Sequence, residues 1–144
     1  MEIRLARSSD IAGWATMRQN LWPEDTVDKH TVEAAELLEK TQQWAVWVAE
    51  KNGLVGFLEA SLREYVDGCE TSPVSYIEGI YVKPEFRRQG ISRMLVREME
   101  NWAKSRGCTE VASDAELSNI ISQQMHQQLG FNEVARIVIF RKEI

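Results

Sequence analysis

Two features suited to chemistry lie close together between residues 77 and 92. An apolar segment, residues 74–82, carries one acid, Glu78, where a carboxylate is costly unless it is paired or reached by water. A short turn then leads into a helix that begins with basic, glycine-containing and small residues, Arg87–Ser92. Helix N-termini offer free backbone N–H groups and partial positive charge, which suit a phosphate or pyrophosphate. The stretch therefore predicts a phosphate-bearing cofactor beside a carboxylate that handles an amine.

Glu78 and Asp114 are the acids most suited to binding an amine. Glu78 can hold an ammonium group and take its proton, directly or through water; the alternative is a glutamate on a solvated stretch of strand. Asp114 ends the expected neighbouring strand, where open sheets place ligands; the alternative is a turn or helix cap. Gly79, next to Glu78, is expected to mark a β-bulge, because glycine inside a strand often does.

Hydrophobic periodicity predicts the elements that position these residues. The expected strands span residues 2–6, 43–50, 54–62, 74–82, 110–114 and 134–141, and the expected helices span 10–21, 29–40, 88–105 and 118–129. This order predicts one α/β domain, residues 1–144, with a mixed sheet covered by helices. One parallel crossover is expected between 74–82 and 110–114, and 134–141 is expected to close the sheet.

Composition narrows the classes of partner. The net charge of −5 argues against nucleic acid, which requires a basic face, and is compatible with a cationic small molecule. No apolar run approaches the roughly 20 residues of a membrane span, and no signal peptide is visible, so we expect no membrane contact and a cytoplasmic protein. The two cysteines, Cys69 and Cys108, suggest neither a disulfide framework nor a metal site.

The segment Arg87-Arg88-Gln89-Gly90-Ile91-Ser92 resembles the acetyl-CoA signature of the GCN5-related N-acetyltransferase (GNAT) family. Ser92 departs from the glycine or alanine of that signature, but it is small enough to keep the turn tight. A closer likeness over nearly the whole chain is to the compact, dimeric aminoglycoside 6'-N-acetyltransferases. The segments that carry this likeness are 20–23, 65–73, 78–82, 112–114 and 119–123.

The resemblance implies a GNAT fold, whose parallel strands splay apart to admit the pantetheine arm of acetyl-CoA. It implies no metal. The Val82 N–H is a candidate donor to the oxyanion that forms during acyl transfer. The residues expected to bind the cofactor are Ile80, Tyr81, Val82, Arg87, Arg88, Gln89, Gly90, Ile91, Ser92 and Asn119, the last of which is alternatively a helix cap.

The resemblance also implies acetylation of the 6'-amino group of aminoglycosides, with antibiotic resistance as the result. Glu78 is the expected catalytic residue, and Trp22, Tyr65, Glu78 and Asp114 are expected to bind substrate. The alternative for Trp22 is core packing at a helix end. His126 stands where many family members carry a tyrosine acid, and we leave it outside the catalytic set. The resemblance further implies a homodimer whose interface includes the last strands.

Two other functions fit the same residues. One is a GNAT acetyltransferase for polyamines or a protein amine, which would use a similar acidic pocket. The other is a non-catalytic acyl-CoA sensor that keeps only the phosphate-binding helix. The pairing of Glu78 with Asp114 argues against the sensor, because binding CoA does not require these acids.

Overall fold

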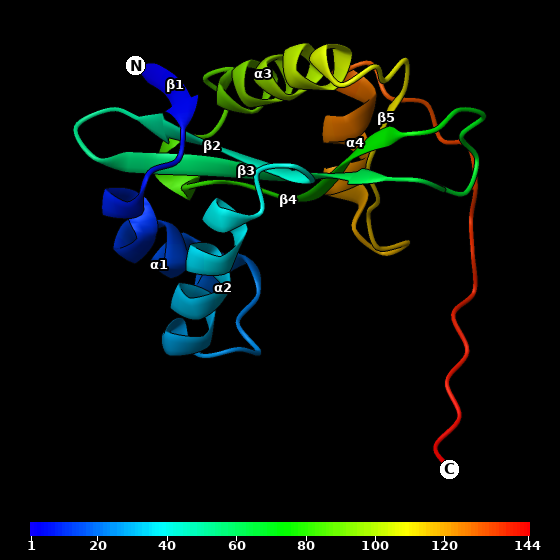
Figure 1. Cartoon of the computed structure of the whole chain (residues 1–144), viewed down its shortest axis with the longest axis horizontal. Coiled ribbons are helices and arrows are strands. Elements are labelled where there is room, and N and C mark those ends of the chain that lie inside the picture. Colours follow the sequence, from blue (N-terminus) through cyan, green and yellow to red (C-terminus); the bar gives the residue numbers. More distant parts are fainter.

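A five-stranded sheet with strand order β1-β2-β3-β4-β5 organises the chain (Figure 1). The computed structural model describes all residues, 1–144. The first four strands are antiparallel, and β4 pairs with β5 in parallel, so the expected mixed sheet with one parallel crossover is confirmed. The strands are β1 (Glu2–Leu5), β2 (Trp44–Glu50), β3 (Leu54–Arg63), β4 (Val74–Val82) and β5 (Val111–Ala112).

Four α-helices cover the sheet: α1 (Ile11–Leu21), α2 (Val27–Glu39), α3 (Ile91–Ser105) and α4 (Ile120–Gln128). In Figure 1, α1 and α2 lie on one face of the sheet and α3 lies on the other. Short 3-10 turns, Ser8–Asp10 and Pro84–Phe86, precede α1 and α3. None of the helices has the length and apolar character needed to cross a membrane.

The hydrophobic core has two layers because successive residues of a strand point to opposite faces of the sheet. In β2, Trp47 joins the layer under α3, while Val46 and Val48 join the layer under α1 and α2. The α3 layer includes Leu58, Ile77, Ile91, Leu95 and Met99. The α1–α2 layer includes Trp14, Met17, Ala34 and Phe57. The sheet is therefore held from both sides.

The start of α1 is tied to β1 by a partly buried ion pair. The Arg4 guanidinium donates from Nη1 and Nη2 to the two carboxylate oxygens of Asp10, at 2.8 and 2.9 Å. Asp10 also accepts from the Arg7 backbone N–H at 2.7 Å. The Arg4 side chain holds the pKa of the Asp10 carboxyl below its usual value. This pair fixes the N-terminal end of α1, which is the end opposite Trp22.

Two helix starts differ from the sequence prediction for local reasons. Helix α3 begins at Ile91 rather than residue 88, because Arg88 and Gly90 have positive φ angles of 62° and 78°. Helix α2 begins at Val27 rather than residue 29, because the Thr26 side chain accepts a hydrogen bond from the Lys29 N–H and caps the helix.

The expected final strand, 134–141, is wrong. Residues after Gln128 form no helix or strand, and the C-terminal tail extends away from the sheet (Figure 1, red). Its apolar side chains are open to solvent, with Phe140 90% exposed. Alternating apolar residues identify a segment that can pair, but β5 has only two residues and pairs with β4 alone. The single chain therefore gives the tail no strand partner.

Candidate active site

A β-bulge places Glu78 in the middle of β4. Glu59 pairs with Gly79 and the next residue, Ala60, pairs with Ile77, so Glu78 is the extra residue on β4. This confirms the bulge expected at Gly79. Bulges bend a strand and re-aim a side chain. Here the bulge turns a carboxylate out of an otherwise regular ladder.

Strand β4 separates from β5 just before the bulge. The parallel pairing is limited to Ser75 with Val111 and Tyr76 with Ala112. From Ile77 to Val82, β4 pairs on one side only, with β3. This is the splayed arrangement expected for the fold, and it leaves backbone groups of β4 without a strand partner beside Glu78.

The Glu78 carboxylate is held by two residues of β3. Arg63 donates from Nη2 to Oε1 at 2.7 Å and from Nε to Oε2 at 2.9 Å, a two-point contact. The buried Ser61 hydroxyl also donates to Oε2, at 2.5 Å. The contact with Glu78 raises the pKa of the Arg63 guanidinium. The Glu78 side chain is therefore paired and lies at the edge of the core.

Tyr76 and Arg63 connect Glu78 to Asp114. The Tyr76 hydroxyl donates a short hydrogen bond to Asp114 Oδ2. The Arg63 guanidinium carbon lies 3.6 Å from the centre of the Tyr76 ring. Burial, and then the bond to Asp114, raise the pKa of Tyr76, so its hydroxyl keeps its proton as a donor. We call Ser61, Arg63, Tyr76, Glu78 and Asp114 the acid cluster.

The sequence prediction missed three members of the acid cluster: Ser61, Arg63 and Tyr76. Ser61 and Arg63 are two residues apart on β3, so they share a face, and Ser61 is the register partner of Tyr76. The hairpin register was the signal that could have found them, because it aligns these residues with the strand that carries Glu78.

Trp22 lies directly against the bulge. It follows the last residue of α1, and a Cβ added to Gly79 would lie 2.4 Å from Trp22 Cη2. The ring also packs against Phe57, with ring centres 6.4 Å apart. Trp22 is therefore beside Glu78 along β4, although it makes no hydrogen bond with the acid cluster.

Tyr65 is placed away from the other predicted substrate residues. It is 74% exposed, and its hydroxyl donates to Asp67 Oδ1 at 3.0 Å. This hydrogen bond raises the pKa of the Tyr65 hydroxyl. The structure connects Glu78 to Asp114 through Arg63 and Tyr76 and places Trp22 against Gly79, the residue after Glu78, but it does not bring Tyr65 into contact with them.

The segment predicted to bind phosphate joins the end of β4 to α3. Arg87 Nε donates to the Val82 carbonyl at 2.9 Å, so its charge is tied to the end of the strand. The Ile91 side chain is buried in the core, and Arg88, Gln89 and Gly90 are exposed. No side chain caps α3, so its first backbone N–H groups are left for a ligand.

The side chains of Asn119 and His126 make hydrogen bonds within the chain. Asn119 Oδ1 caps α4 by accepting from the Ser122 N–H at 3.0 Å. His126 contacts the Ser122 carbonyl through Nδ1 and the Ser113 hydroxyl through Nε2, each at 2.7 Å. Both ring nitrogens are thus engaged, in keeping with a structural histidine. The His, Cys, Asp and Glu side chains form no group of three or more suited to a metal ion.

Comparison with known proteins identifies the family. The profile described as "Acetyltransferase (GNAT) family" matches residues 14–131, which include the bulge, the acid cluster and the start of α3. This chain belongs to the GNAT family. The expected GNAT fold is therefore confirmed, as is the acetyl-CoA co-substrate of an acyltransferase.

Full-length relatives narrow the family further. An aminoglycoside N(6')-acetyltransferase type 1 from Acinetobacter genomosp. 13 is 47% identical over 100% of this chain and 99% of its own length. A Salmonella enteritidis protein of the same description is 39% identical, with 99% of each chain covered. This GNAT enzyme thus belongs with the aminoglycoside 6'-N-acetyltransferases, which confirms the closer resemblance.

Solved structures of aminoglycoside 6'-N-acetyltransferases have the same fold as this chain. AAC(6')-Ig from Acinetobacter haemolyticus is 43% identical, with a TM-score of 0.94 over 100% of this chain and 99% of that one. AAC(6')-Iy in complex with the bisubstrate analogue CoA-S-monomethyl-acetylneamine is 38% identical, with a TM-score of 0.93 over 99% and 98% of the two chains. That structure contains CoA joined to an aminoglycoside derivative.

Replacing Gly90 by Val is expected to weaken acetyl-CoA binding in this GNAT enzyme. Gly90 has φ +78° and no heavy atom within 4 Å of an added Cβ, so the effect comes from backbone strain alone. We expect KM for acetyl-CoA to rise about tenfold, a strain of about 1–2 kcal/mol. KM for the amine should not change. Initial rates with each substrate varied in turn measure both constants, and an unchanged KM for acetyl-CoA contradicts the prediction.

Proposed function

We propose that this protein transfers the acetyl group of acetyl-CoA to the 6'-amino group of aminoglycosides. The observation that carries the proposal is the acid cluster, which places Glu78 and Asp114 together beside the unpaired side of β4. The full-length relatives with this activity support it. We assign the whole chain, residues 1–144, to one catalytic domain that acts in the cytoplasm.

The reaction needs a neutral amine next to an activated acetyl group, which acetyl-CoA supplies as a thioester. Glu78 binds the 6'-ammonium group and takes one proton from it, directly or through water. The amine then attacks the acetyl carbon, and the Val82 N–H stabilises the oxyanion. As the C–S bond breaks, the attacking nitrogen, now positively charged, gives up its second proton, and the departing thiolate takes up a proton and leaves as the CoA thiol. The N-acetylated product has lost one positive charge.

The cofactor is held by backbone groups more than by charge. Residues Ile80–Val82 on the unpaired side of β4 contact the pantetheine arm. Arg87–Ser92 surround the pyrophosphate at the start of α3, where N–H groups and the helix dipole both favour an anion. Asn119 contacts the cofactor through its amide nitrogen while its oxygen caps α4.

The aminoglycoside is recognised by acids and aromatic rings. Asp114 provides a second carboxylate for a polycation, and Trp22 provides an apolar face for a sugar ring, with cation–π attraction to ammonium groups. Tyr65 is the outermost of these residues and contacts the exposed part of the substrate. Acetylation removes a charge and a hydrogen-bond donor from the drug, which weakens its binding to RNA and gives resistance.

The test is a spectrophotometric assay of CoA thiol release with kanamycin, tobramycin and spermidine as acceptors. The proposal expects kcat/KM for the aminoglycosides to exceed that for spermidine by at least about a hundredfold, since this ratio reports true preference. The site of acetylation is read from the mass and NMR spectra of the product. Equal constants for spermidine and kanamycin would favour a polyamine enzyme, and no thiol release with any amine would favour an acyl-CoA sensor.

We also infer a homodimer in which the tail of each chain covers its partner. The tail carries apolar side chains that are exposed to solvent in the single chain, among them Ile137, Ile139 and Phe140. An exposed apolar strand pairs readily with the edge of another sheet. We infer that the tail pairs with the free edge of β5 in the partner subunit, since β5 pairs with β4 alone within one chain.

Deleting residues 134–144 is therefore expected to convert the dimer to a monomer. Sedimentation velocity of the full chain and of the truncated chain at the same concentration measures this change. A full chain that sediments as a monomer, or a truncated chain that remains a dimer, would exclude the tail from the interface.

A further inference from the structure

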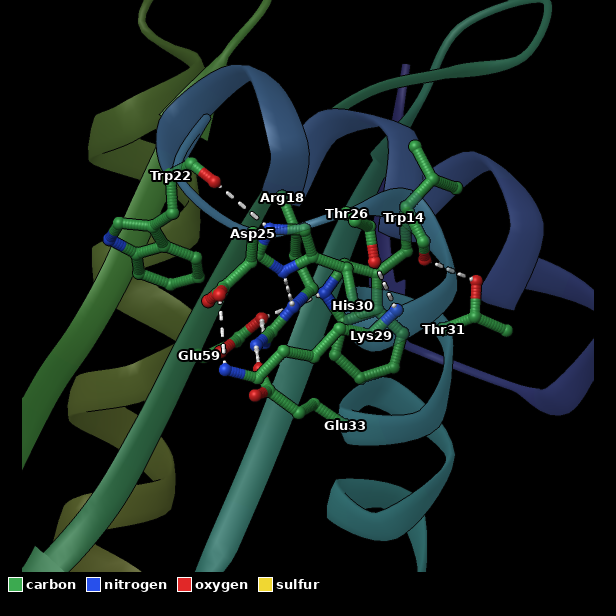
Figure 2. Close-up of polar contacts among 11 residues, drawn as sticks. Trp14, Arg18, Trp22, Asp25, Thr26, Lys29, His30, Thr31, Glu33 and Glu59 are labelled. Carbon is green, nitrogen blue, oxygen red and sulfur yellow. Dashed lines mark hydrogen bonds and ion pairs between the residues drawn. The ribbon is translucent and has the colours of Figure 1, made fainter.

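A buried polar network lies on the α1–α2 side of the sheet, apart from the acid cluster (Figure 2). Its centre is Arg18 of α1, whose side chain is only 6% exposed. Arg18 Nη1 donates to Glu59 Oε2 at 2.5 Å, and Nη2 donates to Glu33 Oε2 at 2.5 Å. The Trp14 indole N–H also donates to Glu59 Oε2, at 2.9 Å. Arg18 of α1 therefore joins Glu59 of β3 to Glu33 of α2.

Glu59 anchors the network to the bulge. It is 2% exposed, and it pairs across the ladder with Gly79, the residue next to Glu78. Burial raises the pKa of Glu59, whereas Arg18 and Trp14 favour its ionised form. A buried ion pair is a weak source of stability, because desolvation offsets the attraction. The value of this pair is that it fixes α1 relative to the bulge in β4.

The network continues from Arg18 to Trp22 through His30 of α2. Arg18 Nε donates to His30 Nδ1 at 3.3 Å. Since a guanidinium only donates, Nδ1 is the acceptor, and Nε2 carries the proton of the neutral ring. His30 Nε2 then donates to the Trp22 carbonyl at 3.0 Å, as Figure 2 shows. Arg18 thus selects the tautomer that binds Trp22.

The same residues enclose the Trp22 ring. The His30 ring stacks on it with centres 6.2 Å apart and planes 24° apart, and the Arg18 guanidinium carbon lies 4.9 Å from its centre. The backbone N–H of Trp22 donates to the Arg18 carbonyl at 2.8 Å. The edge of the ring, at Cη2 and Cζ2, meets Gly79. Backbone and ring are both fixed, so Trp22 is held in one orientation.

We propose that Arg18, His30 and Glu59 are positioning residues. They hold Trp22 against the β4 bulge and thereby fix the orientation of the ring that lines the aminoglycoside site beside Glu78. This inference rests on the proposed function, in which Trp22 lines the aminoglycoside site. None of the three residues needs to touch substrate. Their effect reaches the substrate through Trp22 alone, which makes the proposal testable by a double-mutant cycle.

The first test replaces His30 by Leu, which keeps bulk but removes both hydrogen bonds. We expect KM for kanamycin to rise about tenfold, the effect of about one hydrogen bond, and KM for acetyl-CoA to stay unchanged. His30→Gln, which can still donate to the Trp22 carbonyl, should recover most of the loss. In a Trp22→Ala background, His30→Leu should change KM for kanamycin less than twofold, because the ring that it positions is gone.

A matched control separates positioning from general destabilisation. Arg4→Gln breaks the partly buried pair with Asp10 at the other end of α1. It should lower Tm about as much as His30→Leu while leaving KM for kanamycin unchanged. Thermal unfolding of each variant reports whether it is folded at the assay temperature. If His30→Leu does not fold, His30→Phe, which keeps the stacked ring but makes neither hydrogen bond, is carried through the same cycle with Trp22→Ala.

The outcomes distinguish the two proposals. If the unmodified enzyme releases CoA with kanamycin but the effects of His30→Leu and Trp22→Ala on KM multiply, the positioning role is overturned and the proposed function stands. An increase in KM with Arg4→Gln equal to that with His30→Leu also overturns it. If the enzyme acts only on another amine, the proposed function fails, and the cycle measured with that amine decides the positioning role.

Discussion

Replacement of Glu78 by Gln lowers kcat with kanamycin by about 100- to 10,000-fold, the range for loss of a general base. The amide keeps the shape of the side chain but cannot take the proton of the 6'-ammonium group. It also loses the charge that Arg63 contacts at 2.7 and 2.9 Å. Because Glu78 lies at the edge of the core, stability should fall by less than about 2 kcal/mol. Thiol release at saturating kanamycin and acetyl-CoA measures kcat, and thermal unfolding measures stability.

Glu110→Gln is the matched control. Glu110 is also a hydrogen-bonded acid, accepting from the backbone N–H groups of Glu70 and Thr71 at 2.9 and 2.8 Å, but it lies outside the acid cluster. Its replacement should leave kcat unchanged. Near-normal turnover by the Glu78→Gln enzyme would remove Glu78 from the mechanism.

Replacement of Gly79 by Ala is expected to be the most damaging one-carbon change at the site. The new methyl group would lie 2.4 and 2.7 Å from Trp22 Cη2 and Cζ2. The ring cannot simply move away, because His30, Arg18 and Phe57 contact it. We expect a stability loss of about 1–3 kcal/mol from overpacking. Displacement of Trp22 and of the bulge should lower kcat/KM for kanamycin by about 100-fold.

Urea unfolding and initial-rate kinetics measure these two effects. In a Trp22→Ala background, Gly79→Ala should cost little further stability, because the overlap is gone, but KM for kanamycin should stay raised. Gly13→Ala in α1 is the control. There the added carbon would meet only the Leu54 side chain, at 3.2 Å, and that side chain can shift. A Gly79→Ala enzyme with full activity and stability would show that Trp22 is not fixed against β4.

Local features of the fold were predictable from sequence. The bulge beside Gly79 and the helix that follows Arg87–Gly90 both depend on residues close together in the chain. The errors in predicting these features are small and local. One is the start of α3, which is later than predicted because Arg88 and Gly90 have positive φ angles. The tail was misassigned because a strand needs a partner, and the alternation of residues 134–141 does not say where that partner is.

Candidate site residues could be proposed one by one from sequence, but the contacts that connect them could not. Glu78 and Asp114 were identified singly, as acids in unusual places. Arg63 and Tyr76, which join them, could be recognised only from the strand register. Arg18 lies four residues before Trp22, one helical turn away, yet its pairing with Glu59 depends on how α1 packs on the sheet. Tertiary packing carries that information, and the spacing of residues along α1 does not.

The two-point contact between Arg63 and Glu78 makes substrate binding a form of ion exchange. In the resting enzyme the Glu78 carboxylate already has a cation, and no buried side-chain polar atom lacks a hydrogen-bond partner. An incoming ammonium group therefore replaces or shares an internal counter-ion instead of neutralising a bare charge. A simple amine has little advantage in such an exchange, whereas a molecule that brings several ammonium groups at once can contact Asp114 while it competes with Arg63. In the proposed site, acids that already have internal partners would thus favour a polycation over a simple amine.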